Sequence, residues 1–115
     1  MNNEEETCNA IPENLSTIGE RAHRAIMAVL TECEATDSGG CRSFYSPAEW
    51  LDRGEQYGTI SELVVVYDGG DLAGFFSLDA SYPTYKSHTL MSEALAAEGL
   101  YCEECTCWYA AIYEI

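Results

Sequence analysis

The run Leu63-Val-Val-Val-Tyr67 constrains the fold more than any other stretch of the sequence. Its β-branched residues favour extended backbone. A strand that is apolar on both sides has to be covered on both sides. The run therefore predicts a central strand with a neighbour along each edge. With 115 residues the chain suits one domain, and a domain of this size can bury such a strand.

Helices are expected to cover this strand. Apolar residues recur at spacings of three and four between residues 15 and 34, which predicts an amphipathic helix with Asn14 or Ser16 as its N-cap. A second long helix is expected before Gly99, its predicted C-cap, and its apolar face comprises Leu90, Met91, Ala94, Leu95 and Ala97.

A short helix is predicted within residues 42 to 54. Ser46 and Glu49 have the spacing of a capping box, and Pro47 occupies the first helical position. Trp50 and Leu51 are expected to anchor this helix by their apolar side chains.

Further strands follow from the turn and strand signals. Asp68-Gly-Gly-Asp71 is typical of a tight turn, so residues 73 to 78 are expected to return as the second strand of a hairpin. Residues 100 to 102 and 106 to 115 are predicted as strands, the last of them inside the sheet, because both of its sides are largely apolar.

The fold class expected is α+β: a single two-layer domain with a mostly antiparallel sheet of about four strands and two main helices packed on it. Residues 14 to 115 are assigned to this domain. Residues 1 to 13, with three consecutive acids at positions 4 to 6, are assigned to a flexible acidic tail.

Cys102, Cys105 and Cys107 lie within six positions of one another. Structural zinc sites take four ligands, usually from two C-x-x-C pairs. The sequence has one such pair here, and a fourth ligand would have to come from Cys33, Cys41 or His88. The neighbouring acids would raise the thiol pKa and so disfavour the thiolate that binds metal. We expect these cysteines to pack as small apolar residues and expect no cofactor; a cysteine-based zinc or thiol module is the alternative.

Charge gives the main indication of function. Twenty acidic and five basic residues give a net charge of −15. This charge repels nucleic acid and anionic membranes and attracts basic protein surfaces. We therefore expect a basic, nucleic-acid-binding protein as partner, and no direct binding of nucleic acid or membrane. An acidic surface that serves solubility alone is the alternative. The expected partner-binding face comprises Glu49, Asp52, Glu55, Glu62, Asp68 and Asp71.

Catalytic motifs are missing from the sequence. It contains no G-x-S-x-G, no glycine-rich phosphate loop and no paired-histidine metal motif, so we do not expect an enzyme. The first residues lack the basic and apolar regions of a secretory signal. A cytoplasmic location is expected, where thiols stay reduced.

The segments SPAEWLDRGEQYGTISELVVVYDGGDL and CTCWYAAIY resemble small acidic accessory proteins of phages, plasmids and other mobile elements. The resemblance covers about the last 70 residues and assigns no role to any residue. Such elements often encode acidic inhibitors of host defence, including antirestriction and anti-CRISPR proteins with DNA-like charge. The resemblance implies a stoichiometric inhibitor of a host nucleic-acid-binding defence protein. An antitoxin or immunity protein of a basic toxin is the alternative.

Overall fold

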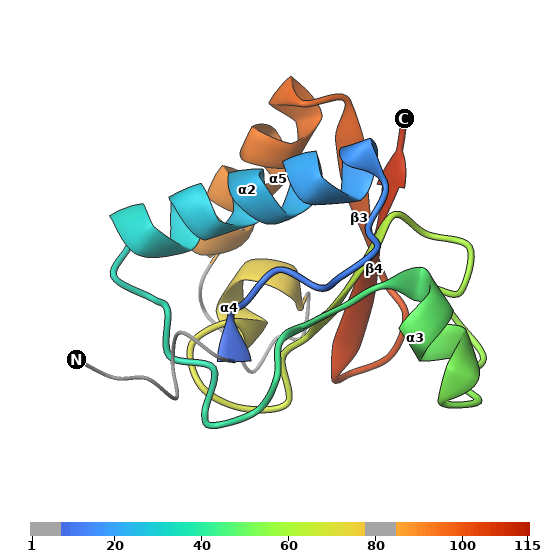
Figure 1. Cartoon of the computed structure of the whole chain (residues 1–115). Coiled ribbons are helices and arrows are strands. Elements are labelled where there is room, and N and C mark those ends of the chain that lie inside the picture. Colours follow the sequence, from blue (N-terminus) through green and yellow to red (C-terminus); the bar gives the residue numbers. More distant parts are fainter. Residues whose placement is uncertain (1–7, 78–84) are drawn as a thin grey trace.

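A four-stranded antiparallel sheet forms the centre of the structure, a computed structural model that describes residues 8 to 77 and 85 to 115 (Figure 1). The strand order is β1-β2-β4-β3. The strands are β1 (Phe44–Tyr45), β2 (Leu63–Val66), β3 (Leu100–Glu104) and β4 (Tyr109–Glu114). The helices are α2 (Thr17–Glu32), α3 (Pro47–Asp52), α4 (Ala73–Phe76) and α5 (Tyr85–Ala97). The predicted α+β class, with a four-stranded sheet and two main helices, is confirmed.

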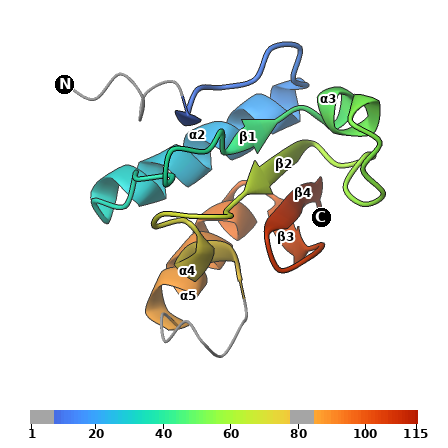
Figure 2. The same cartoon turned by 90° about the horizontal axis from the view of Figure 1, so that it is seen from below.

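The central strand predicted from the apolar run is β2. It is buried along its whole length and pairs with β1 on one side and β4 on the other. The inner position predicted for the last strand is also confirmed, because β4 lies between β2 and β3. One face of this sheet carries α2 and α5, and α3 lies against the other (Figure 2).

The side chains of β2 alternate between two apolar clusters, as the pleat of a strand requires. Leu63 and Val65 belong to the larger cluster, which includes Ile26 of α2 and Leu95 of α5. Val64 and Val66 belong to the smaller cluster on the other face, where Trp50 of α3 is buried. The run is therefore apolar throughout because helices cover both of its faces, α2 and α5 on one and α3 on the other.

The helix predicted over residues 15 to 34 is α2, which begins and ends two residues inside those limits. The hydroxyl of Ser16 accepts a hydrogen bond from the Gly19 N–H at 2.9 Å, which confirms Ser16 as the N-cap. After α5, Gly99 has a φ of 75°, the conformation that favours glycine beyond a helix end. Among the described residues, no helix combines the length and apolarity needed to cross a membrane.

The hairpin predicted from β2 into residues 73 to 78 is wrong. Residues 73 to 76 form the helix α4, and residue 78 lies outside the described residues. Phe75 and Phe76 are buried in the larger cluster. The edge of β2 that a hairpin would need is occupied by β1, since the Val66 N–H donates to the Ser43 carbonyl at 2.7 Å. The remaining strand of the sheet is thus the two-residue β1, which sequence analysis did not detect.

Part of the predicted tail belongs to the folded structure. Residues 1 to 7 lie outside the described residues. Cys8 and Asn9, however, are buried. The Cys8 carbonyl accepts from the Ser43 N–H at 2.9 Å, and the Asn9 side-chain amide donates to the Thr36 carbonyl at 2.6 Å. The segment beside β1 therefore begins at least six residues before the predicted domain boundary at residue 14.

Candidate functional site

An aromatic cluster fixes α3 to the sheet. Trp50 is fully buried, and its ring centroid lies 4.9 Å from those of Tyr45 and Tyr109 and 5.8 Å from that of Trp108. A short helix cannot stabilise itself by backbone hydrogen bonds alone. The packing of Trp50 against these rings compensates for the small size of α3 and gives it a fixed orientation.

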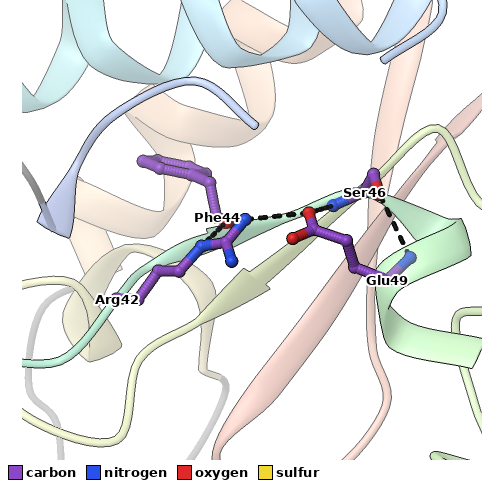
Figure 3. Close-up of polar contacts among 4 residues, drawn as sticks. All are labelled: Arg42, Phe44, Ser46 and Glu49. Carbon is purple, nitrogen blue, oxygen red and sulfur yellow. Dashed lines mark hydrogen bonds and ion pairs between the residues drawn. The ribbon is translucent and has the colours of Figure 1, made fainter. Parts of the chain in front are cut away.

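The start of α3 is fixed by the capping box that the sequence predicts (Figure 3). The Ser46 hydroxyl accepts from the Glu49 N–H at 3.1 Å, and a Glu49 carboxylate oxygen accepts from the Ser46 N–H at 2.9 Å. The same oxygen accepts from Arg42 at 2.8 Å, while Arg42 Nε donates to the Phe44 carbonyl at 2.9 Å. The hydrogen bond from Arg42 is the main cause that lowers the pKa of Glu49. The charge of Glu49 is therefore used within the fold.

The two arginines of this region are held over aromatic rings. The Arg42 guanidinium lies 4.1 Å from the Tyr45 centroid, and that of Arg53 lies 4.5 Å from the Trp50 centroid. Arg53 also pairs with Glu55 at 3.3 Å. Such cation–π contacts hold a cation against a ring face. Both positive charges thus point toward the cluster and each has a carboxylate beside it.

The segment that joins α3 to β2, residues 53 to 62, is attached to the sheet at several points. The Tyr109 hydroxyl donates to the Tyr57 carbonyl at 3.3 Å, and the Glu62 N–H donates to the Ile112 carbonyl at 2.8 Å. Between these points, Gly58 lies so close to Ala111 that an added Cβ would meet the Ala111 Cβ at 3.2 Å. The Ser61 hydroxyl closes a turn by donating to the Gly58 carbonyl at 2.7 Å.

Three large apolar side chains project from α3 and this segment into solvent. Ile60 is 86% exposed, Leu51 is 62% exposed and Tyr57 is 51% exposed. The three residues lie within one ten-residue stretch of the chain, and we refer to them together as the α3–β2 patch. The prediction that Leu51 anchors α3 is wrong: Trp50 alone is buried, because six helical residues present only one narrow face to the sheet. Sequence analysis missed Ile60. An isolated isoleucine among small and polar residues was the feature of the sequence that could have indicated its exposure.

The six acids of the expected partner-binding face form two groups. Glu49, Asp52 and Glu55 lie on or just after α3, and Glu62 lies just before β2. Asp68 and Asp71 follow the other end of β2, where the Asp71 N–H donates to the Asp37 carbonyl at 2.7 Å. The four residues of β2 separate these ends by about 13 Å. The structure therefore brings Asp68 and Asp71 beside the loop of Asp37 and not beside α3.

The acids near α3 differ in how much of their charge is available. Glu49 and Glu55 are each paired with an arginine. Glu62 accepts a hydrogen bond from the Ser16 hydroxyl at 2.6 Å. Asp52 is exposed at the end of α3. Of the four, Asp52 is thus the carboxylate best placed to meet a cation from another molecule.

The three clustered cysteines point to different surroundings. Cys102 packs against the larger apolar cluster, Cys105 packs against the smaller one, and Cys107 is exposed. Burial raises the pKa of Cys102 to about 12 and that of Cys105 to about 11; the neighbouring Cys105 thiol and then nearby acids add to the rise for Cys102, and Glu103 adds to it for Cys105. Within residues 8 to 77 and 85 to 115, no group of three or more histidine, cysteine or acidic side chains is arranged to hold a metal ion.

Comparisons of the chain with family models, with curated proteins and with solved structures each return no match.

Proposed function

We propose that this protein is a small acidic stoichiometric binding protein that occupies the basic surface of a nucleic-acid-binding partner. The observation that carries the proposal is the excess of acidic charge, −15 in total. Three of the five basic residues are in addition engaged in ion pairs, namely Arg21 with Glu98, Arg42 with Glu49 and Arg53 with Glu55. Little positive charge is left to repel a basic partner.

The partner class follows from this charge and from the resemblance to acidic accessory proteins of mobile elements. An acidic surface accelerates association with a basic surface and competes with the phosphates that such a surface binds. A host defence protein that handles nucleic acid, of the kind blocked by antirestriction and anti-CRISPR proteins, has the required surface. A cytoplasmic location fits the proposal, because such targets act on intracellular nucleic acid.

The first test is capture of a partner by the tagged protein from a nuclease-treated host lysate. We expect a basic protein to elute in a salt gradient and to be identified by mass spectrometry. Its association rate, measured by stopped-flow fluorescence, should fall by about tenfold or more when sodium chloride rises from about 50 to about 500 mM. A wild-type bait that retains no basic protein above background at low salt would contradict the proposal.

The two acidic groups allow a matched comparison. Asp52→Lys reverses a charge on α3, and Asp68→Lys reverses one at the opposite end of β2. If the α3 side meets the partner, the first variant should slow association several-fold more than the second. If Asp68→Lys slows association more than Asp52→Lys does, the partner binds near Asp68 and not near α3. A captured toxin, in place of a defence protein, would assign the protein as an antitoxin or immunity protein.

A further inference from the structure

We propose that the α3–β2 patch (Leu51, Tyr57 and Ile60) is the anchor by which this protein docks on its partner, and that the partner presents an apolar hollow bordered by lysine or arginine. This inference rests on the proposed function. It adds the location of the contact and the chemistry of the opposing surface, neither of which the net charge specifies.

The order of the segment is the first argument. Residues 57 to 62 are held by the hydrogen bonds of Tyr109 and Ile112 and by the close packing of Gly58 on Ala111. These contacts use backbone groups and a glycine. They leave the side chains of Tyr57 and Ile60 outside the core. The conformational entropy of the segment is thus already lost in the free protein, and a partner gains the apolar contact at little further entropic cost.

The chemistry of the exposed side chains is the second argument. Ile60 is 86% exposed, so its side chain contributes little apolar burial to the fold and would contribute it at an interface. Tyrosine is enriched among the few side chains that supply most of the affinity of an interface, and Tyr57 lies three residues before Ile60 in the chain. An occupant with an apolar hollow would bury both.

The surrounding charges select the kind of occupant. Asp52 and Glu55 lie on either side of Arg53, whose guanidinium is turned onto the Trp50 ring. Because Glu55 is paired with Arg53, Asp52 is, among the described residues, the exposed and unpaired carboxylate next to Leu51. A second copy of this chain would bring two Asp52 carboxylates together, which costs free energy at an interface, whereas a lysine or arginine of the partner would pair with Asp52.

The test compares four baits in the lysate capture: the wild type, Ile60→Ser, Tyr57→Ser and the control Leu90→Ser. Leu90 is a partly exposed leucine (41%) on α5, which packs on the opposite face of the sheet. Thermal unfolding and circular dichroism of each variant check that it is folded. The captured basic protein is then purified, and its affinity for each variant is measured by isothermal titration calorimetry.

We expect Ile60→Ser and Tyr57→Ser each to weaken binding by about tenfold or more, and Leu90→Ser by less than about twofold. The salt dependence of the association rate should be the same for Ile60→Ser as for the wild type, because the charges are unchanged.

Affinities of the Ile60 and Tyr57 variants within twofold of the wild type would overturn the docking surface and leave the proposed function standing. Failure of the wild type to retain any basic protein would remove both. A wild-type dimer in analytical ultracentrifugation that Ile60→Ser dissociates would show that the patch binds a second copy, and would overturn the basic partner.

Discussion

At the scale of single residues, Gly70 decides how two distant loops meet. Its φ is +72°, and a Cβ added there would overlap the Asp37 carbonyl and the Gly39 nitrogen. Gly54 has a similar φ of +84° but has no atom within 4 Å of such a Cβ. We expect Gly54→Ala to lower the free energy of unfolding by about 1 kcal/mol, the cost of left-handed backbone, and Gly70→Ala to lower it by about 2 kcal/mol or more. Urea denaturation measures both, and equal losses would contradict the close approach of the loops.

The thiols of Cys102 and Cys105 give a second prediction at this scale. Burial raises their pKa values to about 12 and about 11, whereas an unfolded thiol has a pKa of about 8.5. The folded state thus favours the protonated thiol. Its contribution to stability is complete below pH 8.5 and is lost as the pH rises toward the folded values.

The free energy of unfolding should therefore fall between about pH 8.5 and pH 11, measured by urea denaturation at several pH values. The decrease of the unfolding free energy per pH unit should be smaller in Cys102→Ala than in the wild type, whatever that substitution does to stability at pH 7. A slope that does not differ between Cys102→Ala and the wild type would show that the buried thiol is not its source.

At the scale of elements, α3 depends on its cap as well as on Trp50. The Ser46 hydroxyl satisfies the Glu49 N–H at the start of the helix. We expect Ser46→Ala to lower the free energy of unfolding by about 1 kcal/mol. Ser92→Ala, within α5, is the control and should cause no loss, because alanine has the higher helix propensity. Chemical denaturation of both variants measures these losses. If Ser46→Ala is as stable as the wild type, aromatic packing alone maintains α3.

At the scale of the whole molecule, like charges oppose compaction. With a net charge of −15, the folded chain brings carboxylates closer together than the unfolded chain does. Added salt screens this repulsion over about 8–10 Å at physiological ionic strength. We expect the Tm to rise when sodium chloride increases from about 10 to about 300 mM at pH 7. The rise should shrink near pH 4.1, the isoelectric point, where the net charge vanishes. A Tm that is independent of salt at pH 7 would contradict net repulsion.

Sequence alone determined the elements whose signals are local. The apolar run became β2, the period of three and four became α2, and Ser46 with Glu49 became the cap of α3, because propensity, periodicity and capping act within a few residues. The net charge, and with it the expected class of partner, is likewise a property of the sequence.

Only the tertiary structure decided which edges and faces these elements present. The segment after Asp71 became α4 because β1, which has no local signal, occupies the edge of β2 that a hairpin would need. Leu51 and Ile60 became exposed because Trp50 and Gly58 take the positions against the sheet. The six acids were separated because the two ends of β2 point in opposite directions. These outcomes depend on contacts between residues far apart in the chain, and the free energy of such contacts is set by the fold that brings them together.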